Sequence, residues 1–325
     1  MLSVYTHNGS ALERRPIESG GEPPDDAIWV DLVSPSVKED KAVENLLGVA
    51  VPTREEMQEI EVSSRLYVEN GARYMTATMM CNSDTSTPKT TPVTFILAKG
   101  RLVTVRYDDP KPFAIVEHRL GRYCDPEKTS GETVLIDLLD AVIDRCADLL
   151  ERTGAEVDTI SHDIFEPETP TSQYEYKEVL KSLGRSGDLA SKIRESLVSM
   201  NRLLLFLSTE AETMRWRKDR RAHLQSMRRD AASLSDHATY LSNKITFLLD
   251  AMLGVVNIDQ NAIIKIFSIA AVVFMPPTLV ASIYGMNFKT GMIELEWEYG
   301  YIWALALIVL AAIIPLALFK WKKWL

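Results

Sequence analysis

Residues 224–284 read LQSMRRDAASLSDHATYLSNKITFLLDAMLGVVNIDQNAIIKIFSIAAVVFMPPTLVASIY, and this stretch decides the fold. Up to residue 255 its apolar residues recur in alternating steps of three and four, the heptad pattern of long helices that pack together. No proline interrupts residues 222–275, so we expect one helix of about 60 residues, roughly 90 Å long, that continues into an apolar segment. The seam consists of Leu224, Met227, Ala231, Leu234, Ala238, Leu241, Ile245, Leu248, Met252 and Val255.

Two apolar, uncharged segments, residues 266–284 and 301–319, are each close to the roughly 20 residues that cross a bilayer. A buried core hairpin is the alternative, but tryptophans flank the segments as they flank membrane spans. These are Trp297, Trp303, Trp321 and Trp324. We therefore predict two membrane spans joined by an outer loop, residues 285–300.

Charge beside the spans predicts their orientation. Three lysines follow the second span at positions 320, 322 and 323, whereas the loop carries Glu294, Glu296 and Glu298 against Lys289 alone. Positive charge collects on the cytoplasmic side, so we expect both termini in the cytoplasm and a multi-pass protein of the cell inner membrane. The N-terminus has neither the basic region nor the apolar region of a signal peptide.

A polar stripe runs roughly opposite the heptad seam. Its members are Asp236, Asn243, Asp250, Asn257 and Asn261, with Thr239 and Thr246 between them. The stripe is either the solvent-facing side of an amphipathic helix or, if several copies surround one axis, the lining of a hydrated cation path. The same alternatives, a packing seam or a pore lining, hold for the face of the first span. That face carries Ile264, Ser268, Ala271, Met275 and Thr278, next to Pro276 and Pro277.

The rest of the chain reads as a charged, soluble α+β domain of the α/β/α sandwich type. Strands are predicted at residues 27–32, 67–68, 73–80, 93–98 and 102–106, with a Lys99-Gly100 turn between the last two. Ser34 or Ser36 is expected to cap a helix that begins near residue 37, with Pro35 in its first turn. We divide the chain into residues 1–130, the α/β domain, 131–262, the cytosolic helices and stalk, and 263–325, the membrane domain. In the second of two helices before the stalk, the stretch from Gly184 to Gly187 is a candidate interruption.

Composition excludes several classes. A net charge of −9 disfavours nucleic acid as a partner, and the basic cluster at residues 215–221 is interpreted as a solvated face. The three cysteines, Cys81, Cys124 and Cys146, share no metal-binding spacing and are expected to be free thiols. No catalytic motif is found, and the five histidines are scattered, so an enzyme is not expected.

The motif Tyr284-Gly285-Met286-Asn287-Phe288 directly follows the first span. Its position before a last span that ends in lysines and Trp-Leu resembles the CorA family of magnesium and cobalt transport proteins. Residues 257–268 and 274–282, the stretch 28–33 and residues 53–56 resemble the enterobacterial type of that family, so the likeness covers the whole chain. The chain departs from the family in its outer loop, where Ile293 and Ile302 stand at positions that are usually proline.

This resemblance implies a homopentameric funnel whose first span lines the pore and whose second span faces lipid. Gly285, Met286 and Asn287 match the selectivity filter, and Asn261, Met275 and Thr278 match pore-lining positions. The implied function is influx of hydrated Mg²⁺, and also of Co²⁺ and Ni²⁺, driven by the membrane potential and stopped by cytosolic Mg²⁺. Asp84, Asp230 and Asp236 are candidate regulatory ligands, and each is equally readable as an ordinary surface acid. Zinc transport within the superfamily, which Met286 disfavours, and a membrane-anchored sensor or scaffold are the alternatives.

Overall fold

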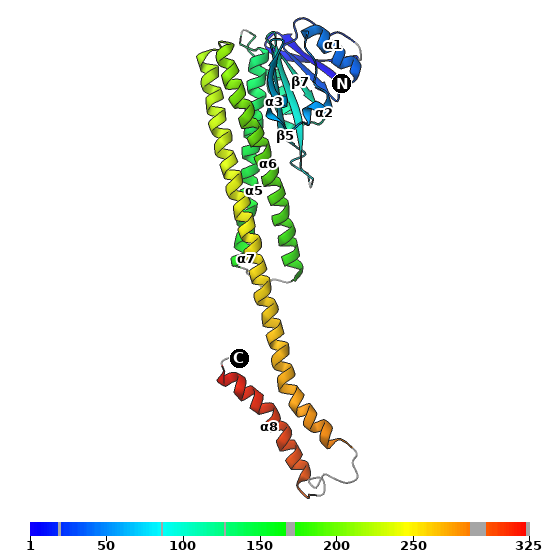
Figure 1. Ribbon diagram of the computed structural model, residues 1–325, viewed down its shortest axis with the longest axis vertical. Coiled ribbons are helices and arrows are strands. Elements are labelled where there is room, and N and C mark those ends of the chain that lie inside the picture. Colours follow the sequence, from blue (N-terminus) through cyan, green and yellow to red (C-terminus); the bar gives the residue numbers. More distant parts are fainter. Residues whose placement is uncertain (19–20, 86, 127, 167–172, 287–296, 323–325) are drawn as a thin grey trace. The chain divides into compact units, whose positions relative to one another are not determined.

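The computed structural model describes residues 1–18, 21–85, 87–126, 128–166, 173–286 and 297–322. It divides into two compact units, Met1–Leu249 and Asp250–Leu325, and one helix contributes residues to both (Figure 1). The strands are β1 (Leu2–Asn8), β2 (Ala11–Ile17), β3 (Trp29–Val33), β4 (Leu66–Glu69), β5 (Ala72–Cys81), β6 (Lys89–Ala98) and β7 (Arg101–Arg106). The helices are α1 (Val37–Leu47), α2 (Arg54–Met57), α3 (Val62–Arg65), α4 (Lys111–Arg122), α5 (Gly131–Phe165), α6 (Gln173–Thr213), α7 (Lys218–Tyr284) and α8 (Gly300–Trp321).

The first unit is built on one mixed sheet of seven strands in the order β2-β1-β3-β7-β6-β5-β4. Only β3 and β7 pair in parallel, and the other neighbours are antiparallel. The N-terminal hairpin of β1 and β2 was not predicted, although Asn8-Gly9 at its turn is a hairpin signal. Pro16 is tolerated in β2 because this strand forms an edge of the sheet.

Helices cover both faces of the sheet, which confirms the α/β/α layering. Successive strand residues point to opposite faces, so Trp29 packs into a core with α4 to α7, while its neighbour Val30 packs into a second core with α1. Figure 1 shows α1 and α2 on one side of the strands and the long helices on the other.

Two predicted local features are confirmed with one correction. Ser36 caps α1 through a capping box, in which its backbone N–H donates to Glu39 Oε2 at 2.8 Å. Pro35 therefore precedes the cap and does not lie in the first turn. The turn between β6 and β7 has positive φ at Lys99 (50°) and Gly100 (78°), as a tight hairpin turn requires.

The heptad seam of α7 is buried within a single chain, except at Leu234 and Val255, which are half-buried. Leu224, Leu241 and Met252 are each at most 3% exposed. Small residues on the neighbouring helices allow close packing, because a Cβ added to Gly154 or Gly187 would contact the side chains of Leu241 or Ile245 at 3.8 and 3.5 Å. The predicted long helix is confirmed at 67 residues.

One expectation about the helices is wrong, and a second holds only in part. The α6 helix continues through the Gly184 to Gly187 stretch without interruption. In the basic cluster, Arg215, Arg217 and Lys218 are exposed as expected. Arg220 is half-buried instead, and its side chain pairs with Glu132 and donates a hydrogen bond to Thr133 Oγ1 at 3.0 Å. Arg220 thus ties the beginning of α7 to the first turn of α5.

Gly131 is expected to tolerate no side chain. A Cβ at this position would lie 2.5 Å from the backbone nitrogen of Leu102 and 2.7 Å from the carbonyl oxygen of Gly100, and backbone atoms cannot move aside. Gly131→Ala should therefore destabilise the protein by about 1–3 kcal/mol, measured as a fall in melting temperature.

Gly184→Ala is the matched control for Gly131→Ala. Gly184 is exposed on α6 with nothing within 4 Å of an added Cβ, so alanine should stabilise the helix by up to about 1 kcal/mol. Equal effects of the two substitutions would contradict the close approach of α5 to the β6–β7 turn.

The second unit contains the two helices that are long and apolar enough to span a membrane, the second part of α7 and α8. Their partly buried residues recur at helical spacing. They are 269, 270, 273, 276, 277, 280 and 284 in α7 after residue 260, and 304, 307, 308, 311, 312, 315 and 319 in α8. This spacing is that of two helices packed along one face each.

Candidate ion pathway

Two prolines lie in α7 about two turns before the predicted filter. Pro276 and Pro277 have no backbone N–H, so the carbonyl groups of Val272 and Val273 lose their helical donors. Thr278 Oγ1 donates to the carbonyl oxygen of Phe274 at 2.7 Å, the next carbonyl along the helix. The two freed carbonyl groups point toward residues 276 and 277, so another helix or water has to supply their hydrogen bonds.

Gly285 and Met286 form the exit from the helix. Their backbone N–H groups donate to the carbonyl oxygens of Ala281 at 2.9 Å and Ile283 at 3.3 Å. A Cβ on Gly285 would lie 3.2 Å from the Ala281 oxygen, tighter than an ordinary contact, so glycine permits this close turn. Asn287, Glu294 and Glu296 lie outside the described residues, whereas Glu298 is described and exposed.

The predicted pore-lining residues of the span share one exposed face of α7. They are Asn261, Ile264, Ser268, Ala271, Met275 and Thr278. At 3.6 residues per turn they lie on the opposite side of the helix from the partly buried residues 269, 273, 276, 280 and 284. The candidate lining is thus the face of the span that no other described residue of the second unit covers.

In the first unit, the polar stripe of α7 is exposed and lies opposite the buried seam. Asp236 and Asn243 are exposed, and the hydroxyls of Thr239 and Thr246 donate to backbone carbonyl groups four residues earlier. Aromatic side chains interleave with the stripe, and Phe247 is 60% exposed. The same mixture continues in the second unit, where Asp250 and Asn257 are exposed.

Asp84, a candidate regulatory ligand, is already surrounded by cations. Its carboxylate pairs with Lys111 at 2.5 Å, with Arg145 at 2.6 Å and with Arg152 at 3.1 Å. Hydrogen bonds from Lys111 and then Arg145 hold the pKa of Asp84 well below its usual range. A metal ion would therefore have to displace three basic side chains from this carboxylate. This cluster was not predicted, although Arg145 and Arg152, seven residues apart, share one face of a predicted helix.

Asp230 and Asp236 are exposed on α7 and do not share a cluster with Asp84 in the described part of the chain. Within that part, no group of three or more His, Cys, Asp or Glu side chains is arranged to hold a metal ion. Asp230 does lie near an acidic row on α5. Burial, followed by repulsion from Asp140 and Asp148 and more weakly from Asp230, raises the pKa of Asp144.

Replacing Asp144 with asparagine is expected to stabilise the protein slightly at pH 8. Because the pKa of Asp144 is raised on folding, stability falls as the pH rises through that pKa, and the full stability returns below the pKa of the unfolded chain. The gain should not exceed about 0.5 kcal/mol, since the side chain is exposed and solvent screens the repulsion.

Thermal unfolding at pH 8 and pH 4, without divalent metal, measures this effect. The difference in melting temperature between Asp144→Asn and the parent protein should be smaller at pH 4 than at pH 8. The control Asp163→Asn replaces an exposed residue of the same helix and should leave the melting temperature unchanged at both pH values. Destabilisation by Asp144→Asn at pH 8 would show that the carboxylate makes a net favourable contact.

Comparison with known proteins places this arrangement in a family. The family model described as CorA-like Mg²⁺ transporter protein matches residues 24–322. The magnesium transport protein CorA of Escherichia coli K12 is 34% identical over 325 residues, the full length of both chains. The complete CorA magnesium transporter of Methanocaldococcus jannaschii superposes with a TM-score of 0.74 at 16% identity, covering 100% of this chain and 99% of that one. The full-length CmaX protein gives 0.69 at 14% identity, covering 100% and 98%. The family model and the full-length identity together establish that this chain belongs to the CorA family of Mg²⁺ transporter proteins.

Proposed function

We propose that this chain is the subunit of a magnesium channel through which the membrane potential drives hydrated Mg²⁺ into the cytosol. One observation carries the proposal: α7 is a continuous helix with one face, from Asn261 to Thr278, that no other described part of its unit covers. In the sequence, Gly285-Met286-Asn287 directly follows the last residue of this helix, Tyr284. The full-length relative of Escherichia coli that bears the name magnesium transport protein supports magnesium as the substrate. Co²⁺ and Ni²⁺ are secondary substrates in this proposal.

The chemistry of the motif suits a hydrated ion. Mg²⁺ prefers octahedral oxygen coordination and releases its water slowly. Amide oxygens of Asn287 and carbonyl oxygens of Gly285 can accept hydrogen bonds from the waters of the ion, which selects for size and hydration without removing the shell. Carboxylates in the filter would bind the ion too tightly for release. Glu294, Glu296 and Glu298 in the outer loop instead raise the local cation concentration.

The protein is proposed to act as a homopentamer in the inner membrane, with both termini in the cytosol. The exposed side of α7 supports self-association, because Tyr240 and Phe247 remain 56% and 60% exposed beside the polar stripe in one chain. Native mass spectrometry should find about 183 kDa, five times the 36.6 kDa of one chain. The functional division that we propose is residues 1–130, 131–262 and 263–325.

Cytosolic Mg²⁺ is proposed to close the channel through carboxylates that include Asp230 and Asp236, with Asp84 as a third candidate. The first two are exposed on α7, whereas Asp84 would have to exchange its three basic partners for the metal. The double variant Asp230→Asn/Asp236→Asn should retain uptake when internal Mg²⁺ is high, measured with an internal dye. Regulation identical to that of the parent protein would exclude this pair.

A growth test addresses the substrate in cells. The chain is expressed in a bacterial strain without its own magnesium uptake, and growth is followed at micromolar external Mg²⁺. Growth is expected to be restored by the parent protein. Failure of a membrane-inserted protein to restore growth, together with increased sensitivity to zinc, would instead favour zinc as the substrate.

A further inference from the structure

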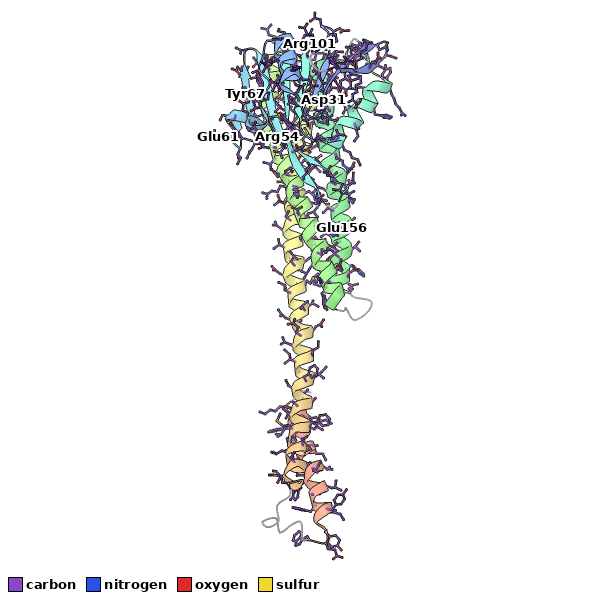
Figure 2. All side chains as sticks on the ribbon, turned by 90° about the vertical axis from the view of Figure 1, so that its right-hand side faces the viewer. Asp31, Arg54, Glu61, Tyr67, Arg101 and Glu156 are labelled. Carbon is purple, nitrogen blue, oxygen red and sulfur yellow. The ribbon has the colours of Figure 1, made fainter. Side chains whose placement is uncertain are left out.

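A pocket of about 470 Å³ lies in the first unit, where α6 meets the residues of α3 and β5. Three arginines line it, Arg65 at the end of α3 and Arg194 and Arg202 on α6. Hydroxyl groups of Thr78 and Ser199 also line it, and Glu195 is the one acid among its lining residues. Figure 2 shows Glu61 and Tyr67, which flank Arg65 in the sequence, at the periphery of this unit.

The positive charge of this pocket is not neutralised. Arg194 and Arg202 are exposed, and none of the three arginines forms an ion pair within the described part of the chain. Burial lowers the pKa of Arg65, Glu195 opposes this, and the nearby Arg202 lowers the pKa further. Three guanidinium groups against one carboxylate leave an excess of two positive charges, which an anion would relieve.

Part of the pocket is rigid without a ligand. Arg65 Nε donates to the carbonyl oxygen of Glu59 at 2.6 Å, and its Nη1 donates to Thr78 Oγ1 at 3.1 Å. The backbone N–H of Thr78 donates to Ser199 Oγ at 2.9 Å, which ties β5 to α6. The two bonds of Arg65 hold the Nε and Nη1 side of its guanidinium group in place. Its Nη2 forms no hydrogen bond with the described residues.

The spacing on α6 suits more than one phosphoryl group. Arg194 and Arg202 are eight residues apart, about 12 Å along the helix axis. The pocket volume lies within the usual range for small-molecule sites.

We propose that this pocket binds a phosphorylated anion through Arg65, Arg194 and Arg202. Planar guanidinium groups match the geometry of phosphate oxygens and form charge-assisted hydrogen bonds with them. The phosphoryl groups come either from free inorganic phosphate or diphosphate, or from the phosphate chain of a nucleotide. This binding does not depend on the transport function of the chain.

Calorimetric titration of the purified full-length protein, without divalent metal, tests the proposal. The probes are inorganic phosphate, diphosphate, ADP and, as the ligand control, adenosine. Diphosphate and ADP are expected to bind, adenosine is not, and added salt should weaken binding. Because ADP and diphosphate carry the same number of phosphoryl groups, equal affinities identify the phosphate chain alone as the ligand, whereas tighter binding of ADP identifies a nucleotide.

Four variants locate the site. Arg194→Gln and Arg202→Gln should each lower the affinity about tenfold, because each removes a charge-assisted hydrogen bond. Glu195→Gln should raise the affinity several-fold, because it removes the acid that competes for the arginines. Arg229→Gln, an exposed arginine on α7, is the matched control and should change nothing.

Two results would overturn the proposal. The first is the absence of binding by all three phosphorylated probes at millimolar concentration. The second is undiminished affinity in the Arg194→Gln/Arg202→Gln protein. Since both arginines are exposed, we expect this double variant to keep the melting temperature of the parent protein. The raised affinity expected for Glu195→Gln is an independent test, because that variant keeps all three arginines.

Discussion

Replacing Asn287 with alanine is expected to abolish potential-driven Mg²⁺ entry. In the proposed pentamer the substitution removes five amide oxygens that accept hydrogen bonds from the water shell of the ion. Hydrogen bonds that involve a charged group contribute about 1.5–3 kcal/mol each, so the loss of several should reduce flux more than about 100-fold. Dye-reported Mg²⁺ entry into liposomes measures the effect.

Asn45→Ala is the control for the Asn287 substitution. Asn45 is an exposed asparagine of α1, and its replacement should leave both assembly and flux unchanged. Substantial flux through assembled Asn287→Ala pentamers would place the filter elsewhere on the pathway.

The largest expected effect on stability comes from a buried ion pair in the sheet. Asp31 of β3 is 1% exposed, and Figure 2 labels it in the first unit. Its carboxylate accepts hydrogen bonds from Arg106 Nη2 at 2.8 Å and from Thr104 Oγ1 at 2.6 Å. Arg106 also lies over the ring of Phe113, 4.5 Å from its centroid. Asp31→Ala leaves a buried guanidinium group without its main counter-ion and should destabilise the protein by about 3–5 kcal/mol.

A double variant separates the loss of the pair from the loss of packing. Replacing both partners, Asp31→Ala with Arg106→Met, should recover part of the melting temperature lost in Asp31→Ala, because no unpaired charge remains buried. Asp25→Ala is the control, since that side chain is 98% exposed and should shift stability by less than about 0.5 kcal/mol. A double variant less stable than Asp31→Ala would contradict the dominance of the unpaired charge.

Much of the fold could be predicted from local patterns in the sequence. The seam from Leu224 to Met252 predicted a buried helix face, because apolar residues that recur every three or four positions lie on the same side of a helix. The hairpin of β1 and β2 was missed because the alternation in residues 11–17 is broken by Glu13, Arg14 and Arg15 on an edge strand. Gly184 failed as a signal of a break, since packing of α6 against its neighbours outweighs the low helix propensity of one residue.

The residues of the candidate ion pathway could be predicted only where they all lie on a single helix. The exposed face of α7 from Asn261 to Thr278 follows from helical spacing. The surroundings of Asp84 do not, because Lys111 and Arg145 come from different helices that only the tertiary fold brings together. The arginine pocket joins Arg65 to Arg202 across 137 positions of the sequence, and no local pattern records that proximity.

Mg²⁺ entry into liposomes at a fixed membrane potential tests the central claim most directly. A potassium gradient with valinomycin sets the interior at −100 mV or at zero, and an internal dye reports Mg²⁺. A divalent ion gains about 4.6 kcal/mol at −100 mV, at 2.3 kcal/mol per charge, so entry should be much faster than at zero potential. Entry that does not respond to the potential, or no entry through assembled pentamers at either potential, would contradict a potential-driven magnesium channel.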